Sequence, residues 1–287
     1  MPALFRQLTI CGVGLIGGSL AVSARKHGLV ERIVGLGRTQ RNLDIALARG
    51  FLDLATRDPA EAARGADLVM LATPVMTFPA TLAAMMPYLP AHAVVTDVGS
   101  VKGWVVRELE PLLGPAMALV GVHPVAGKET TGAAAAEETL FVDRRVIITP
   151  SARSTAEAVA KVEALWRATG AKVEQMTPET HDAILARASH LPQIVASALA
   201  AALENEMVDG RRAADFGAGG LRDTTRIAAS SPEMWRDICV TNQSAIAAAL
   251  RLYRDTLAEF VRAVDDSDQA ALIALFERGR RMRERLK

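Results

Sequence analysis

Two separated segments of the chain contain side chains that could remove a proton from a small molecule. His123 lies in GVHPVAGKE and Ser100 lies in DVGSVK, each directly after a short apolar run. Histidine is the side chain whose ordinary pKa best suits a general base near neutral pH. We therefore interpret His123 as a base for a hydroxyl proton, and Ser100 as a hydrogen-bond partner of that histidine or of the substrate. The alternative is a structural role for His123, which is the commoner role of a single histidine after a strand.

A glycine-rich segment near the N-terminus has the spacing G-x-G-x-x-G. Gly12, Gly14 and Gly17 directly follow an apolar run and open a segment with helical spacing. In this context the first glycine permits a tight turn, the second lets the backbone approach a pyrophosphate, and the third lets helix and strand pack closely. Leu15 and Ile16 then place backbone N–H groups at a helix N-terminus, where they can bind phosphate. The segment predicts a dinucleotide site, and the alternative is an ordinary glycine-rich turn.

The residues at the end of the apolar run 32–37 indicate whether NAD or NADP would accept the hydride in a dehydrogenation. NAD sites usually have Asp or Glu here, whereas this sequence reads GLGRTQR. Arg38 can pair with the 2′-phosphate of NADP, Thr39 can donate a hydrogen bond, and Arg41 can assist, so NADP is favoured and NAD remains possible. The alternative is that Arg38 is a solvated residue that stacks on adenine. Thr73 and Pro74, which end a later apolar run, are also predicted to contact the cofactor.

Strands that alternate with helices must position these residues in the first part of the chain. Short apolar runs separated by helical segments are typical of a parallel sheet covered on both faces. We therefore predict a doubly wound, Rossmann-type α/β domain over residues 1–176, with its ligands at the carboxyl ends of the strands. Strands are expected at 8–12, 32–37, 66–73, 93–98, 118–122, 145–148 and 172–175, and helices at 16–27, 43–49 and 155–169.

Residues 177–287 have a different pattern. They are rich in alanine and leucine at helical spacing over 181–209, 232–260 and 268–286, with a glycine-rich interruption at 210–225 and no strand-like runs. We predict an all-helical domain that binds substrate. Its alanine-rich faces exceed what one small core requires, so a homodimer through this domain is expected.

Composition excludes several classes of protein. The chain has 287 residues, half of them hydrophobic, and a net charge of +1, so neither a nucleic-acid partner nor an anionic membrane partner is expected. It has no signal-peptide pattern and no apolar run long enough to span a bilayer. Only two cysteines are present, which favours a reducing compartment and a cytoplasmic protein.

Five segments, in order along nearly the whole chain, together resemble the prephenate/arogenate dehydrogenase family. The last segment is long, and its TTRIA and MWRDI parts are specific. The segments are GVGLIGGS (12–19), TDVGSVK (96–102), GVHPVAGKE (121–129), SHLPQ (189–193) and GGLRDTTRIAASSPEMWRDI (219–238). The resemblance implies oxidative decarboxylation of prephenate to 4-hydroxyphenylpyruvate with hydride transfer to NAD(P), or the corresponding conversion of arogenate to tyrosine. Aromatisation drives such a reaction, so no metal is expected.

The resemblance also implies roles for individual residues. His123 would take the proton of the ring hydroxyl, with Ser100 supporting it. Arg226 would bind a substrate carboxylate, as the planar fork of arginine allows, and the alternative is a surface ion pair. Glu129 and Asp223 occupy the places of the acids that position this arginine.

The resemblance implies roles for four further residues, some of which have an alternative role. His190 would line the substrate pocket or else lie in the core, and Trp235 lies near the site, where packing is the commoner role of tryptophan. Lys102 would contact the cofactor or cap a helix. Many relatives have a histidine at the position of Gln193, which can hydrogen-bond the substrate side chain without adding charge. Because arogenate carries an ammonium group that an acid would favour, Gln193 favours prephenate.

Two rival functions remain at this stage. The first is a hydroxyacid or imine oxidoreductase of the same two-domain plan, which would not require His123 and Arg226. The second is a non-catalytic NADPH-binding regulator, which would require only the glycine segment and Arg38. No regulatory ACT domain or chorismate mutase is recognisable, so control by tyrosine through such a domain is not expected.

Overall fold

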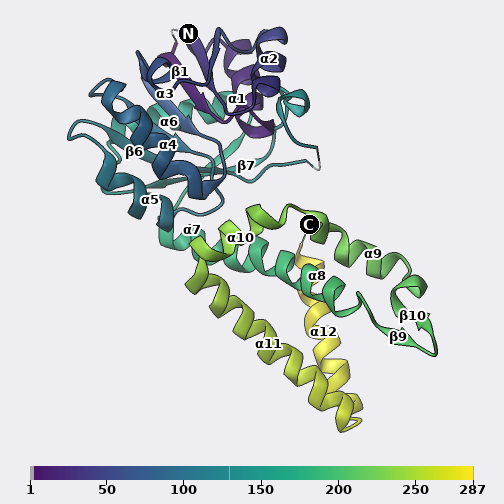
Figure 1. Cartoon of the computed structure of the whole chain (residues 1–287). Helices are drawn as coiled ribbons and strands as arrows, with labels where there is room; N and C mark the ends of the chain where they lie inside the picture. Colours follow the sequence, from purple (N-terminus) through teal and green to yellow (C-terminus); the bar gives the residue numbers. More distant parts are fainter. Residues whose placement is uncertain (1–2, 129, 287) are drawn as a thin grey trace.

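An eight-stranded sheet forms the centre of the N-terminal half. The structure is a computed structural model and describes residues 3–128 and 130–286 (Figure 1). The strands are arranged in the order β3-β2-β1-β4-β5-β6-β7-β8. They are β1 (Phe5–Cys11), β2 (Val30–Leu36), β3 (Leu54–Thr56), β4 (Leu68–Leu71), β5 (Val94–Asp97), β6 (Ala118–Pro124), β7 (Arg145–Pro150) and β8 (Lys172–Gln175). The predicted doubly wound class is confirmed, and the three-residue edge strand β3 is an addition to the prediction.

One strand pair departs from the parallel arrangement. β7 runs antiparallel to β6, with His123 opposite Ile147, whereas every other neighbouring pair of the described sheet is parallel. A parallel connection requires a crossover, usually a helix. The described part of 125–144 contains only the 3₁₀ turn Ala133–Ala135, so the chain returns beside β6 in the opposite direction.

Helices cover both faces of this sheet. Consecutive residues of β4 alternate between two apolar clusters: Leu68 and Met70 belong to one, Val69 and Leu71 to the other. This alternation explains why the strands read as continuous apolar runs, because both of their faces are buried. The helices are α1 (Leu15–Lys26), α2 (Gln40–Ala48), α3 (Pro59–Ala63), α4 (Phe78–Met85), α5 (Gly103–Leu109) and α6 (Ala156–Ala168).

The C-terminal half is helical, with breaks that the sequence pattern did not indicate. The predicted helix over 181–209 contains a π-helical turn at Ala186–His190, and the predicted helix over 232–260 is broken at Asn242. The interruption at 210–225 contains a short helix. A hairpin of two strands with two residues each precedes that helix. The elements are α7 (Pro178–Leu185), α8 (Leu191–Ala202), β9 (Met207–Val208), β10 (Arg211–Arg212), α9 (Gly219–Thr225), α10 (Pro232–Thr241), α11 (Gln243–Asp265) and α12 (Gln269–Arg285).

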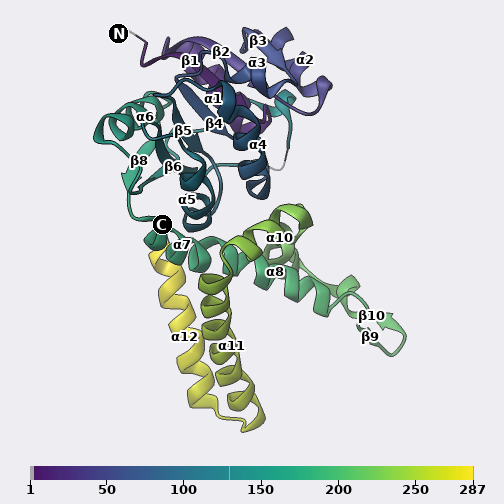
Figure 2. The ribbon, with the colours of Figure 1, turned by 60° about the vertical axis from the view of Figure 1, so that its left-hand side comes forward.

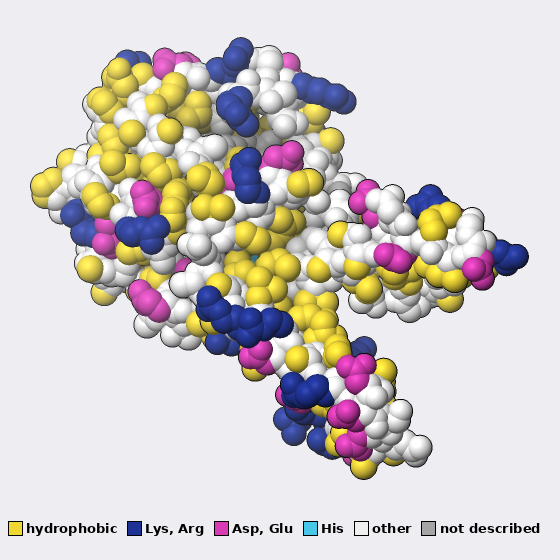
Figure 3. Space-filling model, turned by 60° about the horizontal axis from the view of Figure 1, so that its bottom comes forward, with side chains coloured by type: hydrophobic (Ala, Val, Ile, Leu, Met, Phe, Trp, Pro, Cys, Tyr) yellow, Lys and Arg dark blue, Asp and Glu magenta, His cyan; other side chains and the backbone are white. Residues whose placement is uncertain are grey.

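Two arms extend from the α/β half. One contains α8, α9 and the β9–β10 hairpin, and the other is the antiparallel pair of α11 and α12, which returns the C-terminus towards α7 (Figure 2). Apolar side chains gather on the face between the arms (Figure 3). Leu252, Val261 and Val264 of α11 and Ile273 and Phe276 of α12 are each more than half exposed. No described helix is both long and apolar enough to cross a membrane.

Candidate active site

The turn between β1 and α1 contains the three glycines of the predicted dinucleotide site. Gly12 has φ +104°, and a Cβ on it would lie 2.6 Å from the carbonyl carbon of Ala72. A Cβ on Gly17 would lie 2.4 Å from the Gly12 oxygen, so helix and strand pack too closely for any side chain there. A Cβ on Gly14 would meet no atom within 4 Å, and no side chain caps α1 at this residue. The turn therefore fits a pyrophosphate, which could approach the backbone at Gly14 and the helix N-terminus beyond it.

The other predicted cofactor residues lie around this turn. Leu15 and Ile16 form the first turn of α1. Thr73 follows β4, the neighbour of β1, and its backbone nitrogen would be 2.8 Å from a Cβ on Gly12. Its hydroxyl hydrogen-bonds the hydroxyl of Thr77 at 2.7 Å, and Pro74 between them is exposed. The carboxyl ends of β1 and β4 thus place all of them at one edge of the sheet.

Arg38 and Thr39 directly follow β2, the strand on the other side of β1. Both are exposed, and Thr39 precedes α2 without capping it through its side chain. The acid expected of an NAD site is absent from the GLGRTQR segment. Arg38 and Thr39 are therefore accessible to the adenosine end of a dinucleotide, and their contact with a 2′-phosphate stays a prediction.

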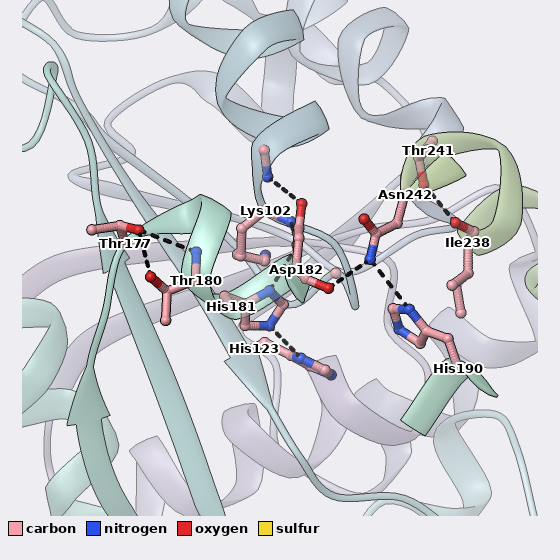
Figure 4. Close-up of polar contacts among 12 residues, drawn as sticks. Lys102, His123, Thr177, Thr180, His181, Asp182, His190, Ile238, Thr241 and Asn242 are labelled. Carbon is pink, nitrogen blue, oxygen red and sulfur yellow. Dashed lines mark hydrogen bonds and ion pairs between the residues drawn. The ribbon is translucent and has the colours of Figure 1, made fainter. Parts of the chain in front are cut away.

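A chain of three polar side chains joins β6 to α7. His123 of β6 is buried, and its Nδ1 lies 2.8 Å from Nε2 of His181. Nδ1 of His181 in turn lies 2.8 Å from Oδ1 of Asp182 (Figure 4). The Asp182 carboxylate accepts two backbone hydrogen bonds of 2.8 Å, to Oδ1 from Lys102 N and to Oδ2 from Gly103 N. This hydrogen-bond chain therefore ends on the backbone N–H groups at the start of α5, in the α/β half.

Lys102 lies inside the protein beside this chain. Its side chain is completely buried, forms an ion pair with Asp97 and donates a 2.8 Å hydrogen bond to the carbonyl oxygen of Val122. Asp97 also accepts backbone hydrogen bonds from Gly99 and Val122. Burial lowers the pKa of Lys102 and raises that of Asp97, and the ion pair opposes both shifts. The ammonium is therefore held by Asp97 and Val122, and the contact of Lys102 with a cofactor stays a prediction.

Ser100 is half-buried on the segment between β5 and α5. Among the described residues its hydroxyl forms no side-chain hydrogen bond, and the Nδ1 atom of His123 is bound by His181 instead. Only Nε2 of His123 is left for a serine or for a substrate. The supporting role of Ser100 stays a prediction, directed at that atom.

His190 and Trp235 lie beside each other in the helical half. The two rings are 6.0 Å apart in an edge-on arrangement, and Nδ1 of His190 is 3.3 Å from Nδ2 of Asn242. Nε2 of His190 and Nε1 of Trp235 are both buried, and neither has a hydrogen-bond partner in the part of the chain that the structure describes. Because buried polar atoms are nearly always paired, these two atoms mark a place where a polar ligand group would fit.

Gln193 connects α8 to the segment that contains Arg226. It is buried, and its Nε2 donates a 2.9 Å hydrogen bond to the carbonyl oxygen of Ile227. Arg226 begins a 3₁₀ turn and is exposed, and Asp223 is exposed three residues earlier on α9. Glu129 lies outside the described residues. The carboxylate-binding role of Arg226 and the positioning role of the acids stay predictions.

Burial determines the charge of the three histidines. Burial above all, and then the nearby His181 and Lys102, hold the pKa of His123 well below its ordinary value. Burial also lowers the pKa of His181, and it lowers that of His190 to about 4. At neutral pH these imidazoles are therefore uncharged, and His123 has a lone pair that can accept a proton.

A dinucleotide-binding turn and an uncharged, buried histidine thus lie at the carboxyl edge of one doubly wound sheet. This combination supplies a hydride acceptor and a proton acceptor to the same region. The fold and the site define an NAD(P)-dependent dehydrogenase with a helical second half.

Comparisons with known proteins identify the family. The family model for the nucleotide-binding domain of prephenate dehydrogenase matches residues 20–175, and that for the dimerization domain matches residues 177–278. The chain belongs to the prephenate dehydrogenase family. It is 34% identical over 285 residues to the cyclohexadienyl dehydrogenase of Zymomonas mobilis, covering 99% of this chain and 97% of that one.

Solved structures agree with this assignment. The prephenate dehydrogenase of Aquifex aeolicus, in complex with hydroxyphenyl propionate and NAD+, superposes with a TM-score of 0.90 at 33% identity and covers 98% of both chains. The arogenate dehydrogenase of Synechocystis superposes with a TM-score of 0.84 at 30% identity, over 98% of this chain and all of that one. The resemblance found in the sequence is confirmed at the level of the family.

Sequence reasoning missed His181, Asp182 and Asn242. Asn242 donates a 3.0 Å hydrogen bond to the main-chain oxygen of Asp182 and lies 3.3 Å from Nδ1 of His190, so it connects Asp182 to His190. The available signal was the His-Asp pair at 181–182, four residues after the helix-capping Thr177. The apolar period over 181–209 indicates only that this pair begins a helix.

Proposed function

We propose that the chain converts prephenate to 4-hydroxyphenylpyruvate and CO2, with transfer of a hydride to a nicotinamide cofactor, in tyrosine biosynthesis. The observation that carries the proposal is His123, an uncharged, buried base at the same edge of the sheet as the dinucleotide-binding turn. Membership of the prephenate dehydrogenase family supports the substrate class.

The residues of the chain would perform three tasks in this reaction. Nε2 of His123 accepts the proton of the C4 hydroxyl, while the bound cofactor supplies the acceptor for the C4 hydride. Arg226 holds a carboxylate and so orients the ring. As CO2 leaves, the electron pair of the C1–carboxylate bond enters the ring, which becomes an aromatic phenolate. The phenolate oxygen then takes the proton back from Nε2 of His123 to give the phenol. Burial of His123 and His190 keeps water away from the reacting atoms.

We propose NADP as the preferred cofactor, with NAD as the alternative. Support comes from the exposed pair Arg38 and Thr39 directly after β2 and from the missing acid at that place. The relative with a TM-score of 0.90 was solved with NAD+, which supports the alternative.

Arogenate is the alternative substrate. Gln193 supports prephenate because it adds no negative charge for the ammonium group of arogenate, and its amide already donates to Ile227. The cyclohexadienyl and arogenate dehydrogenases among the similar proteins support the alternative.

The proposal extends to the organisation of the protein. Residues 1–176 would bind the cofactor, and residues 177–287 would bind substrate and pair with a second copy of the chain. The exposed apolar faces of α11 and α12 and the match to a dimerization domain support a homodimer. The scarcity of cysteine supports a cytoplasmic location.

A two-by-two steady-state assay tests the proposal. Prephenate and arogenate are each supplied with NADP or NAD, and reduction of the cofactor is followed by its absorbance. We expect the highest kcat/KM with prephenate and NADP. Preference for arogenate would overturn the substrate, and preference for NAD would overturn the role of Arg38. The absence of turnover in all four combinations would overturn the function itself.

A further inference from the structure

The hydrogen-bond chain from Asp182 to His123 has a direction. A histidine ring nitrogen donates or accepts depending on the tautomer, so the distances of 2.8 Å between His123 and His181 and between His181 and Asp182 do not by themselves give that direction. The other partners of Asp182 do.

Asp182 can only accept hydrogen bonds. Its two carboxylate oxygens receive the backbone N–H groups of Lys102 and Gly103, which are donors under all conditions. Burial tends to raise the pKa of this carboxyl, but the hydrogen bonds from His181 and from those two backbone groups bring it below its ordinary value. The group is therefore a carboxylate at neutral pH.

The tautomers of both histidines follow from this end of the chain. Since Asp182 accepts, Nδ1 of His181 must donate, which leaves a lone pair on its Nε2. That lone pair faces Nδ1 of His123 at 2.8 Å, so Nδ1 of His123 must carry the hydrogen. The remaining nitrogen of His123, Nε2, is then unprotonated.

We propose that His181 and Asp182 are positioning residues that hold His123 in its Nδ1–H tautomer, with the lone pair of Nε2 ready to take the substrate proton. The proposal rests on the proposed function only in one respect, namely that the proton comes from the C4 hydroxyl of prephenate. No proton passes along the chain: the hydroxyl proton binds Nε2 of His123, and Nδ1 keeps its own.

The charged groups around the chain agree with this role. Lys102 and Asp97 lie together on the α/β side, and His190 faces it from the helical half. The Lys102 ammonium disfavours protonation of His123 in the resting protein. When His123 becomes an imidazolium, it donates more strongly to His181, and the negative charge of Asp182 stabilises the pair.

The arrangement also joins the two halves of the molecule. His181 and Asp182 belong to α7, whereas His123, Lys102 and Gly103 belong to the α/β half (Figure 4). The orientation of the base therefore depends on how α7 packs against the start of α5.

The first test measures the tautomers directly and needs no turnover. Long-range ¹H–¹⁵N correlation spectra of ¹⁵N-histidine-labelled protein distinguish protonated from unprotonated ring nitrogens, and single His→Gln variants assign the five histidines. We expect Nδ1–H signals for both His123 and His181 at neutral pH. In Asp182→Asn the amide can donate to His181, and we expect His123 to change to its Nε2–H form. An Nε2–H tautomer of His123 in the unaltered protein, or an unchanged tautomer in Asp182→Asn, would overturn the proposal whether or not prephenate is the substrate.

The second test separates positioning from simple packing. His181→Gln retains an acceptor for Nδ1–H of His123, whereas His181→Leu removes it. We expect kcat to fall on the order of 100-fold in His181→Leu and less than about 10-fold in His181→Gln, with KM and the Kd of the cofactor nearly unchanged in both. His92→Gln, on the exposed surface, is the matched control and should behave like the unaltered protein.

The pH profile completes this test. Because the acceptor holds the base in one tautomer, His181→Leu should shift the pH dependence of kcat, while His181→Gln should retain it. Equal losses of kcat in the two variants, with unshifted profiles and equal falls in Tm, would show a packing role and overturn the proposal.

Discussion

The two ends of the candidate active site are built in different ways. The predicted cofactor end is one continuous turn, in which Gly12, Gly14 and Gly17 provide the shape and the N-terminus of α1 faces the proposed pyrophosphate site. The base end is assembled from side chains of β6, of α7, of the π-helical turn and of Asn242 between α10 and α11, whose sequence positions are far apart. A local backbone site tolerates changes in distant parts of the fold, whereas a side-chain network fails when any one of its elements shifts. Variants at the two ends should therefore behave differently.

The largest effect is expected at the base itself. Because we propose Nε2 of His123 as the proton acceptor, His123→Gln should lower kcat by about 10³-fold or more, as removal of a general base commonly does. The Kd of the cofactor should stay within about twofold, because the glycine turn does not depend on this side chain. Steady-state kinetics and a cofactor titration measure the two quantities. A variant with full activity would contradict the mechanism.

A substitution in the glycine-rich turn between β1 and α1 should affect cofactor binding instead of the base. Gly12→Ala would press a Cβ against the Ala72 carbonyl at a positive φ, so we expect cofactor binding to weaken on the order of 100-fold and stability to fall by about 1–3 kcal/mol. Gly14→Ala is the matched control, since its Cβ meets no protein atom. It should leave the thermal unfolding of the cofactor-free protein unchanged and weaken only cofactor binding. Equal losses of stability in the two variants would contradict the assignment of the open space at Gly14.

Arg226 tests the substrate side of the base end. Arg226→Lys retains the charge but loses the planar fork, so we expect KM for the substrate to rise about 10- to 100-fold. The cofactor Kd should stay unchanged, because Arg226 belongs to the helical half. A smaller loss in Arg226→Lys than in Arg226→Gln would show that charge contributes beyond geometry. Unchanged KM in both would remove Arg226 from the site.

Arg38 tests the adenosine end of the cofactor site. Arg38→Gln should raise KM for NADP about 10-fold and leave KM for NAD nearly unchanged, because only NADP has the 2′-phosphate. The ratio of the two kcat/KM values measures the effect. If both cofactors weaken equally, Arg38 stacks on adenine and does not recognise phosphate.

The smallest effect is a loss of stability in acid. The pKa of His190 is lowered to about 4 by burial, so below its ordinary value the unfolded chain binds protons that the folded chain does not. Stability should therefore fall as the pH falls, by about 1 kcal/mol between about pH 6.5 and 5.5 from this residue. Chemical denaturation at several pH values measures the slope. His190→Gln should have a shallower slope, and an unchanged slope would contradict a buried, neutral His190.

The sequence predicted much of the fold, because its signals are local. Strands buried on both faces read as apolar runs, and the turn after β1 needs glycine where φ is positive. The helical pattern over 232–260 predicted one helix, but the helix is broken at Asn242. The side chain of Asn242 contacts the main-chain oxygen of Asp182 and the ring of His190, which are distant in sequence, and no helical period reveals such contacts.

In the candidate site, too, the sequence indicated one residue and gave no signal for its partner. His123 was predicted as a base from its position after a strand over 118–122. In the structure β6 continues to Pro124, so His123 lies within the strand, near its carboxyl end. Ser100 was expected to hydrogen-bond His123 or the substrate, and that role stays a prediction for Nε2 of His123. The partner of Nδ1, which no sequence pattern indicated, is His181, 58 residues away in sequence. A partner at that separation is chosen by packing of α7 against the sheet and leaves no spacing signal near either residue.

The sequence alone therefore determined the class of the fold, the glycine-rich turn after β1 and the resemblance to a family. Each of these depends on residues close together in the chain or on motifs in a set order. Only the tertiary structure decided which nitrogen of His123 is held, which acid ends the hydrogen-bond chain, and that Lys102 is buried against Asp97. The physical reason is that a tautomer and the partner of a buried charge depend on which groups lie within hydrogen-bond distance after the two halves have packed together.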